Sequence, residues 1–548
     1  MAVVNSYSQG STDRPLLGET IGSNLRRTAQ KFPDREAFVF LHQSSRFTYA
    51  QFDDSVDLLA RALIASGIER GDRVGIWSPN TVEWAQIQYA TARLGIILVN
   101  INPAYRASEL EFVLKQSGTK LLLTLVEHKG ANYAEMVDMV RSKVPKLEKV
   151  LFTDTDGYRE WLATESQKVS QDQVDKRQSL LDFDDPINIQ YTSGTTGFPK
   201  GATLSHFNLL NNGFFVGEGC GYTERDRVCI PVPYYHCFGM VMGNLAVTSH
   251  GATAIVPSAS FDPVATLRAV EQEKCTSLYG VPTMFIAELA LPEFSNFDLT
   301  SLRTGIMAGS PCPVEVMKKV QSQMHMDQVT ICYGMTETSP VSMQTKLDDP
   351  IDKRVSTVGA VHPHVEVKIT DASGHIVERG EVGEFCTRGY SVMLGYWNDP
   401  EKTAQAIDSA RWMHTGDLAI MDSDGYVNVV GRIKDMIIRG GENIYPREIE
   451  EFIFNHPDVV DVSVIGVPDP KFGEEVMAWI RIREGSSVTA DDIVKFCKGS
   501  IAHYKVPRYV KITDSFPMTV TGKIQKYLMR EAAIGELGLG EHASTPTA

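Results

Sequence analysis

One stretch of the sequence carries polar groups in an arrangement that suits phosphate. Between an alternating run at 186–191 and a new element that begins at 202 lies a loop of glycines, four hydroxyl side chains and one lysine. Glycines let backbone N–H groups approach a ligand closely, and hydroxyls add donors for phosphate oxygens. The lysine follows a proline and no Ser or Thr comes after it, so the loop is not of the Walker type. We interpret it as a phosphate-binding loop rather than a mobile surface turn; its residues are Thr192, Ser193, Gly194, Thr195, Thr196, Gly197, Phe198, Pro199 and Lys200.

Four further clusters place a charged or hydroxyl side chain beside glycine. Each has a plainer interpretation when taken alone: an ordinary polar turn, a common Gly-Asp turn, an interdomain linker and a solvent-exposed turn lysine. Asp417 follows a glycine, as an acceptor for a ribose diol would, and Lys523 lies on a tight turn. In chain order the clusters are Tyr333-Gly334-Met335-Thr336-Glu337-Thr338, Trp412 to Leu418, Gly431 to Asp435 with Gly440-Gly441-Glu442, and Pro517 to Ile524.

Composition excludes several classes of protein. The 548 residues are too many for one core, and a net charge of −15 argues against a general nucleic-acid or anionic-membrane surface. The 8 cysteines show no spacing suited to zinc and are typical of scattered thiols in a reducing compartment. No apolar run approaches the ~20 residues of a membrane span, and no signal, transit or peroxisomal pattern is evident. We therefore expect a cytoplasmic protein without a transmembrane segment.

Short apolar runs alternate with amphipathic helices, which predicts parallel α/β layering. A helix is expected around 56–64, a capping box at Ser108 to Glu111, and a helix capped by Asp262. Residues 154–185 show no clean period and are interpreted as a surface connection. Turns should lie beyond the carboxyl ends of the strands, where ligands bind in such sheets. The expected strands are 73–77, 120–126, 252–256, 276–279, 303–307 and 328–333, and the turns of interest begin at 280, 308 and 334.

The composition and the pattern of expected helices and strands change along the chain and predict four parts. Residues 1–20 are a flexible lead-in, and 21–432 form a large α/β domain with a small β-rich subdomain at about 340–430. Residues 433–534 form a compact, mobile α+β domain, in which Pro446 opens a helix, strands follow at 462–467 and 477–482, and Thr489 or Asp491 caps another helix. Residues 535–548 are a disordered tail rich in Gly, Ser, Thr and Pro.

In this order and over this length, the clusters resemble one family. The chain is similar to the AMP-forming acyl-CoA synthetases of the adenylate-forming superfamily, which also holds firefly luciferase and peptide-synthetase adenylation domains. The resemblance covers about residues 20–530 and rests on 192–200, 333–338 and 517–523. Within the family the chain looks most like the medium-chain fatty acyl-CoA ligases, through Ala104-Tyr105-Arg106 and Gly395-Tyr396-Trp397.

The resemblance implies a two-step reaction and a role for each cluster. A carboxylate attacks the α-phosphate of ATP to give an acyl-adenylate and pyrophosphate, and coenzyme A then displaces AMP. By analogy the loop 192–200 holds the β- and γ-phosphates, Thr336 bonds the α-phosphate, and Glu337 holds Mg²⁺. Lys523 bridges the carboxylate and the α-phosphate. Adenine is bracketed by Gly309, Ser310, Pro311, Tyr333 and Gly334, and the ribose by Asp417 and Arg432.

The same resemblance gives the interdomain segment a role. Members of the family rotate the C-terminal domain about the position of Lys434 after adenylation, which brings Gly440, Gly441 and Glu442 to the channel for coenzyme A. Other members carry Asp at the hinge position. The expected partners are small molecules: fatty acid, ATP and coenzyme A. No nucleic acid is expected as a partner, and the chain could form a homodimer.

The predicted acyl pocket is formed by residues from apolar segments of the sequence. Its candidates are His236 as an aromatic gate, Met240, Val281, Met307 and Met335, and a simple core histidine is the plainer interpretation of the first. These segments hold no Lys or Arg to pair with a second carboxylate, and flexible methionines suit an aliphatic chain. A medium-chain fatty acid is predicted. The alternatives are long-chain or aromatic acids, a carrier protein as acceptor, a luciferase-type oxygenase, and a non-catalytic binder, which should have lost Lys523 or Glu337.

Overall fold

The computed structural model describes residues 4–192, 199–310, 312–518 and 524–539. Its contacts divide the chain into two compact units. The larger unit comprises Ser8–Val367 and Thr387–His414, and the smaller unit comprises Met1–Tyr7, Lys368–Cys386 and Thr415–Ala548.

A seven-stranded sheet forms one half of the larger unit, in the order β21-β11-β10-β5-β4-β6-β9. Its central strands pair in parallel, whereas β11 runs antiparallel to both β10 and β21. Most of these strands are short runs of buried apolar residues, the pattern expected when both faces of a sheet are covered. The bounds are β4 (Arg73–Trp77), β5 (Ile97–Ile101), β6 (Leu121–Thr124), β9 (Lys149–Phe152), β10 (Pro186–Thr192), β11 (Lys200–Ser205) and β21 (Gly395–Tyr396).

A nine-stranded sheet forms the other half, in the order β18-β17-β16-β15-β14-β12-β13-β2-β3. The six strands from β16 to β2 are parallel neighbours, and antiparallel strands close both edges. The bounds are β2 (Glu36–Phe40), β3 (Ser45–Thr48), β12 (Arg227–Cys229), β13 (Thr253–Val256), β14 (Ser277–Gly280), β15 (Thr304–Ala308), β16 (Gln328–Gly334), β17 (Val341–Gln344) and β18 (Ala360–Val361).

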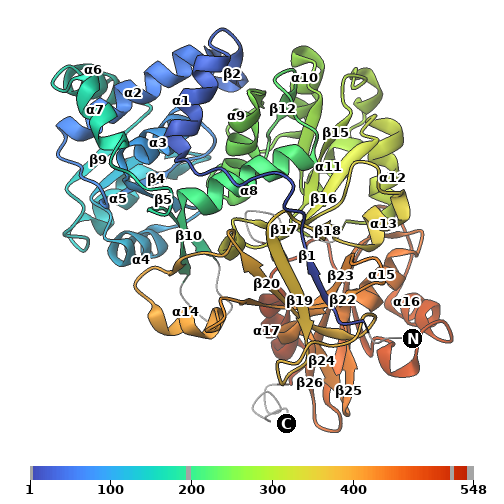
Figure 1. Ribbon diagram of the computed structural model, residues 1–548. Helices are drawn as coiled ribbons and strands as arrows, with labels where there is room; N and C mark the ends of the chain where they lie inside the picture. Colours follow the sequence, from blue (N-terminus) through green and yellow to red (C-terminus); the bar gives the residue numbers. More distant parts are fainter. Residues whose placement is uncertain (1–3, 193–198, 311, 519–523, 540–548) are drawn as a thin grey trace. The chain divides into compact units, whose positions relative to one another are not determined.

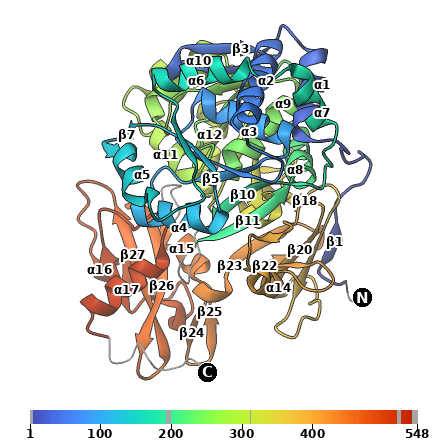
Figure 2. The same cartoon turned by 90° about the vertical axis from the view of Figure 1, so that its left-hand side faces the viewer.

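Three hydrophobic clusters show that these sheets are stacked between layers of helices. Side chains alternate along each strand, so Ile76 of β4 faces the cluster between the two sheets while Trp77 faces an outer cluster. The helices α4 and α5, both labelled in Figure 2, contribute to this outer cluster. Between the sheets lie α1, α2, α3 and α8, and α8 contacts both β11 and β17 (Figure 1). A third cluster packs α10, α11 and α12 on the outer face of the nine-stranded sheet. The result is a five-layer α/β/α/β/α stack.

Helices and short elements complete the larger unit. They are α1 (Ile21–Lys31), η1 (Leu41–Gln43), α2 (Tyr49–Ala65), α3 (Val82–Leu94), α4 (Ala107–Ser117), β7 (Glu127–His128), β8 (Ala131–Asn132), α5 (Tyr133–Arg141), α6 (Asp156–Ser166), α7 (Gln171–Gln178), α8 (His206–Gly219), η2 (Phe238–Leu245), α9 (Ala246–His250), α10 (Pro263–Glu273), α11 (Pro282–Leu289), η3 (Phe294–Asn296), α12 (Val314–Gln323), η4 (Thr336–Thr338), α13 (Ile351–Ser356) and α14 (Pro400–Ala406).

Two further sheets account for the rest of the chain. A five-stranded sheet has the order β1-β19-β20-β22-β23, and the C-terminal sheet has the order β25-β24-β27-β26 with β28 beside β27. The helices α15 and α17 contact β26. The bounds are β1 (Tyr7–Gln9), β19 (Val365–Thr370), β20 (Val382–Gly389), β22 (Met413–Met421), β23 (Val427–Arg432), η5 (Ile433–Asp435), β24 (Ile437–Arg439), β25 (Glu442–Ile444), α15 (Pro446–Phe454), β26 (Val459–Asp469), β27 (Gly473–Ile482), α16 (Ala490–Cys497), η6 (His503–Lys505), β28 (Tyr509–Ile512) and α17 (Lys526–Glu536).

The predicted fold class is confirmed, since layered α/β sheets are followed by a small C-terminal α+β part. Several local predictions also hold: Asp262 caps α10 by accepting from the Ala265 N–H at 2.8 Å, and Thr489 caps α16 within a capping box. All six expected strands are present, with ends shifted by at most a few residues.

Four local predictions differ from the structure. Residues 154–185 contain α6 and α7 rather than an irregular connection. The capping box of α4 is formed by Glu109 and the N–H of Arg106, at 2.9 Å, so the helix begins before Ser108. Residues 7–9 of the expected lead-in form β1, and 535–536 of the expected tail belong to α17, while 540–548 lie outside the described residues.

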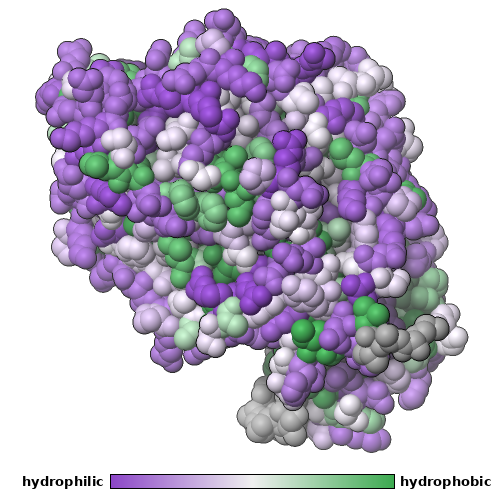
Figure 3. Space-filling model, in the orientation of Figure 1, coloured by the Kyte–Doolittle hydropathy of each residue, from purple (hydrophilic) through white to green (hydrophobic). Residues whose placement is uncertain are grey.

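The surface is consistent with the composition. The face in Figure 3 is largely hydrophilic, with apolar residues in small scattered groups. None of the helices that the structure describes combines the length and the apolar character needed to cross a membrane.

A buried histidine makes the stability of the larger unit depend on pH. His206 begins α8 with no exposed surface, and its Nδ1 accepts from the Ile21 N–H at 3.2 Å, which fixes α1 against α8. Burial lowers the pKa of His206 to about 4 from an ordinary 6.5. The unfolded chain therefore binds the proton first, so this contribution to stability is present above pH 6.5 and is lost as the pH falls toward 4.

We expect His206→Gln to flatten the pH dependence of unfolding in that range. Wild type should lose up to about 3 kcal/mol more of its unfolding free energy than the variant between pH 7 and pH 4. Urea unfolding at a series of pH values measures this difference. His375→Gln, at an exposed position, is the matched control and should follow wild type. Parallel curves for wild type and His206→Gln would contradict the assignment.

Candidate active site

The Glu337 carboxylate lies where strands of both large sheets end. It sits on η4, directly after β16 of the nine-stranded sheet, and is 5% exposed. Its Oε1 accepts from the Tyr396 hydroxyl at 2.9 Å and from the Thr192 hydroxyl at 3.4 Å. Thr192 ends β10 and Tyr396 belongs to β21, both in the seven-stranded sheet. One carboxylate oxygen thus joins the two sheets.

The same carboxylate has a donor set that suits a hard divalent cation. Across the described part of the chain, no Lys, Arg or His forms an ion pair with Glu337, and no donor contacts its Oε2. A buried carboxylate whose described donors are only neutral hydroxyls suits a cation, because a cation would offset the cost of burying its charge. Mg²⁺ takes oxygen ligands and binds through one or two carboxylates together with substrate phosphates. Glu337 therefore fits the role of a Mg²⁺ ligand.

The two ends of the predicted phosphate loop are fixed beside this carboxylate. Thr192 and Lys200 pair across β10 and β11, and the Lys200 Nζ lies 5.0 Å from the centre of the Tyr396 ring. A partly buried chain of hydrogen bonds joins β10 to the residue after β21: the Tyr191 hydroxyl donates to Gln116, whose Nε2 donates to the Trp397 carbonyl at 2.6 Å. Ser193 to Phe198 lie outside the described residues.

Four turns meet at one edge of the nine-stranded sheet. The strands β12, β14, β15 and β16 are parallel neighbours, so their carboxyl ends lie side by side. They lead to Tyr235-His236, Val281, Gly309 and Met335 respectively. This is the arrangement that the sequence predicts for a ligand site.

His236 and Thr336 are linked through a thiol in this group of turns. The Cys237 Sγ lies 3.7 Å from the His236 Nδ1 and 4.0 Å from the Thr336 hydroxyl. The His236 Nδ1 also accepts from the Phe238 N–H at 3.2 Å, which leaves the ring proton on Nε2. His236 is partly buried rather than enclosed in the core.

The predicted adenine-binding residues lie on adjacent strand ends. Gly309 has a φ of +94°, a left-handed backbone that favours glycine, and Ser310 beside it is exposed. Tyr333 and Gly334 end the neighbouring strand β16. A Cβ at Gly334 would lie 1.7 Å from the Pro340 carbonyl oxygen, so the close approach of two backbones requires glycine there. Pro311 lies outside the described residues.

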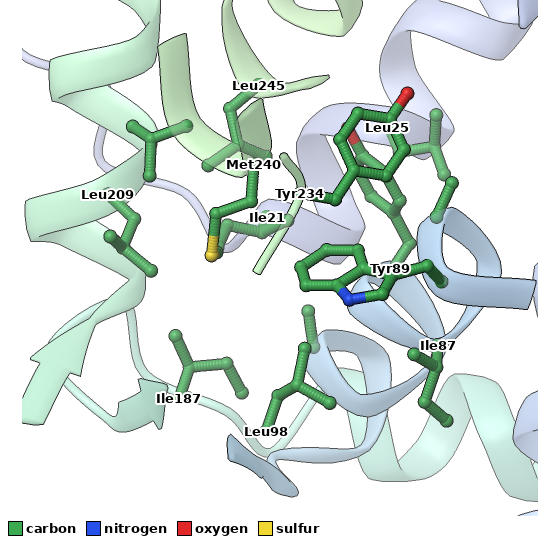
Figure 4. Close-up of a cluster of buried hydrophobic side chains, with 14 of the residues drawn as sticks. Ile21, Leu25, Ile87, Tyr89, Leu98, Ile187, Leu209, Tyr234, Met240 and Leu245 are labelled. Atoms are coloured by element: carbon green, nitrogen blue, oxygen red, sulfur yellow. The ribbon is translucent and has the colours of Figure 1, made fainter. Parts of the chain in front are cut away.

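Most of the predicted acyl-pocket residues pack against one cluster. Met240 is part of η2, a π-helix, and lies among buried apolar side chains from several elements (Figure 4). Val281 and Met335 pack against the same cluster. Met307 does not, because its side chain points to the outer face of the sheet, into the cluster beneath α10 to α12.

Two buried amides hold the sulfur of Met240. The Asn100 Nδ2 lies 3.0 Å from the Met240 Sδ and the Gln190 Nε2 lies 3.1 Å from it, while both side chains are 3% exposed. Thioether sulfur is a weak hydrogen-bond acceptor, yet both amides place a donor within hydrogen-bond distance of it. Met240 is thereby fixed, although methionine is otherwise among the most flexible apolar side chains.

Sequence reasoning missed these amides and the role of Tyr396. Asn100 and Gln190 were visible only as polar residues inside apolar strands, where a buried amide needs a partner. Tyr396 belongs to a two-residue strand that has no periodicity to reveal it.

The remaining predicted residues belong to the smaller unit. Asp417 on β22 is 7% exposed and accepts from the Arg432 Nε at 3.0 Å, across the antiparallel pair β22–β23. Lys434 lies on η5, which joins β23 to β24. Lys523 lies outside the described residues, and next to it Met518 and Ile524 form an antiparallel bridge.

The predicted coenzyme A loop is a tight hairpin turn. Gly440 and Gly441 have φ values of +60° and +90°, as a two-residue turn between β24 and β25 requires, and Glu442 begins β25. The Gly440 N–H donates to the Phe472 carbonyl at 2.8 Å, and the neighbouring Arg439 forms a bidentate ion pair with buried Glu475.

Comparison with known proteins identifies the family. Residues 25–397 match the model of the AMP-binding enzyme family, and 448–523 match the AMP-binding enzyme C-terminal domain. The chain therefore belongs to the AMP-binding enzyme family. Membership confirms the predicted enzyme class, an AMP-forming acid–thiol ligase that uses ATP and coenzyme A as co-substrates.

Similar proteins support this class over nearly the full chain. A Bacillus subtilis protein named "Putative acyl-CoA synthetase YngI" is 50% identical over 541 residues, covering 95% of this chain and 98% of the relative. The mitochondrial medium-chain acyl-CoA ligase ACSF2 of Danio rerio is 45% identical, covering 98% of this chain and 92% of the relative. The crystal structure of the anthranilate CoA ligase AuaEII in complex with anthranoyl-AMP superposes with a TM-score of 0.85 at 26% identity, covering 96% and 99% of the two chains.

Proposed function

We propose that the chain activates a medium-chain fatty acid to its acyl-adenylate and then transfers the acyl group to coenzyme A. The observation that carries this proposal is the buried Glu337 carboxylate, held by the Tyr396 and Thr192 hydroxyls between the ends of the phosphate loop and the turns after β12, β14, β15 and β16. The choice of acid rests on the name of the ACSF2 relatives and on the apolar surroundings of Met240.

The chemistry explains why such a site is needed. A thiol cannot displace an oxygen from a carboxylate, because oxide is a poor leaving group. Attack of the carboxylate oxygen on the α-phosphorus breaks the bond to pyrophosphate and creates a mixed anhydride, from which AMP departs readily when the coenzyme A sulfur attacks. Both steps require that the reactants be held in line and that charge on the phosphoryl oxygens be stabilised.

We assign the phosphate end of this reaction to the larger unit. Lys200, Thr192 and the loop between them hold the β- and γ-phosphates, and Thr336 donates to the α-phosphate. Glu337 holds Mg²⁺, which neutralises charge on the triphosphate when it is bound. Tyr333, Gly334 and the turn that begins at Gly309 flank adenine, and His236 lies at the entrance to the acyl pocket.

We assign the ribose, hinge and thiol-side roles to the smaller unit. Asp417, oriented by Arg432, accepts from the ribose hydroxyls, and Lys523 stabilises the adenylation transition state. Lys434 is the hinge, and the Gly440-Gly441 turn lines the path of coenzyme A. In this proposal 21–432 is the adenylation domain and 433–534 the mobile C-terminal domain.

The experiment that tests the proposal measures AMP and pyrophosphate release across acids from acetate to palmitate, with benzoate and malonate. We expect a maximum at medium chain length and AMP release that requires coenzyme A. A maximum with benzoate would favour an aromatic acid, and adenylation without transfer to coenzyme A would favour a carrier protein. Absence of acid-dependent pyrophosphate release would refute the proposed function.

Lys523→Ala should separate the two half-reactions. We expect adenylation to fall by about a hundredfold or more, the scale of losing one transition-state charge contact, because the lysine acts only in the first step. Thioester formation from supplied acyl-AMP and coenzyme A should be nearly unchanged. Lys319→Ala, at an exposed position on α12, is the control. An equal fall in both half-reactions would show that the lysine serves both.

Met240→Ala should shift the preferred chain length upward. Removing a side chain that two amides fix in place leaves space for a longer acyl tail. We expect the ratio of kcat/KM for longer over shorter acids to rise by about tenfold or more. Met324→Ala removes a fully buried methionine from the outer cluster and controls for lost packing. If both variants keep the wild-type chain-length profile, Met240 does not limit the pocket.

A further inference from the structure

The Tyr396 side chain contacts two of the predicted ATP-site residues, Glu337 and Lys200. Its hydroxyl donates to the Glu337 Oε1 at 2.9 Å, and its ring lies 5.0 Å from the Lys200 Nζ. The same Oε1 accepts from Thr192 at 3.4 Å, a longer and weaker contact. The Tyr396 side chain therefore contacts both the Glu337 carboxylate and the Lys200 ammonium group.

The backbone around Tyr396 is fixed to both partners, so the hydroxyl has a defined position. Trp397 donates its N–H to the Gly201 carbonyl at 2.7 Å, which attaches this segment to the strand that begins at Lys200. Met393 donates its N–H to the Glu337 carbonyl at 2.9 Å. The Tyr396 N–H donates to the Thr403 hydroxyl at 2.9 Å, and the side chain is 8% exposed.

The Tyr396 hydroxyl is the donor in this contact, because a carboxylate oxygen accepts. A neutral phenol that donates to a carboxylate forms a charge-assisted hydrogen bond, and it removes one of the two oxygens from competition for other partners. The second oxygen, Oε2, is left facing no donor within the described residues.

We propose that Tyr396 is a positioning residue that orients the Glu337 carboxylate for the Mg²⁺ of MgATP, while its ring supports the Lys200 side chain. This inference rests on the proposed function of Glu337. It gives the Gly395-Tyr396 strand a role in ATP binding although Tyr396 itself touches no reacting atom. The role predicts a defect in metal and nucleotide binding that is separate from any defect in acid binding.

Tyr396→Phe tests the hydroxyl alone, because the ring and its contact with Lys200 are kept. Binding of Mn²⁺·ATP, followed by electron paramagnetic resonance, should weaken by about tenfold or more, as expected when a hydrogen bond to a charged group is lost. The Mg²⁺ concentration for half-maximal pyrophosphate release should rise by a similar factor. The KM for the fatty acid, and thioester formation from supplied acyl-AMP, should change little.

Tyr390→Phe is the matched control, since Tyr390 is a partly buried tyrosine whose hydroxyl accepts from the Asn212 amide at 3.5 Å and, within the described part of the chain, forms no hydrogen bond with Glu337. Equal Mn²⁺·ATP affinity in the two variants would overturn the proposal. In a Glu337→Gln background, Tyr396→Phe should cause no further loss, and an additive loss would also overturn it. If Tyr396→Phe unfolds, Thr192→Val, which removes the weaker donor, should weaken Mn²⁺·ATP binding by a smaller factor.

The binding measurement does not depend on the reaction. If wild type released no pyrophosphate with any acid, the proposed function would fail. The effect of Tyr396 on Mn²⁺·ATP binding could then still be observed or refuted.

Discussion

A buried carboxylate, Glu337, that forms no ion pair with a Lys, Arg or His of the described residues is the constraint on which the larger unit depends. Placing the Glu337 carboxylate in a nearly water-free position is costly, and the two hydroxyl donors offset only part of that cost. The donors come from the neighbouring sheet, so two sheets that share one inner hydrophobic cluster must end at the same point. The precision of the site is therefore a property of the five-layer stack rather than of any single loop.

The sequence predicted well those features that follow from local pattern. Buried apolar runs such as 73–77 and the Asp262 cap needed no tertiary information. The stretch 154–185 failed because α7 buries only Val174, which leaves almost no apolar period to detect. The two-residue strand at Tyr396 exists only because β11 offers it a partner. Such an element cannot be recognised before the sheet is known.

Candidate site residues were predictable to the extent that type and spacing define chemistry. Glu337 and Asp417 were identifiable as acceptors beside glycines, and both are buried and oriented by a second residue in the structure. Met307 shows the limit of such reasoning. Its neighbours Ile306 and Ala308 face the inner cluster, so the alternation of a strand, not residue type, decides which residues border the pocket. The contact of Tyr396 with Glu337 was hidden because Tyr396 lies on a two-residue strand, whereas Arg432 was predicted beside Asp417.

The π-helix that carries Met240 has a consequence for how this enzyme can diversify. A π-helical turn contains one more residue than the α-helix it interrupts, so it is the usual result of inserting one residue. Deleting Gly239, which directly precedes Met240, would rotate the side chains that follow and move Met240 away from the two amides. Under the proposed function, in which Met240 borders the acyl pocket, selectivity for the acyl tail can thus evolve by a single insertion or deletion in this helix.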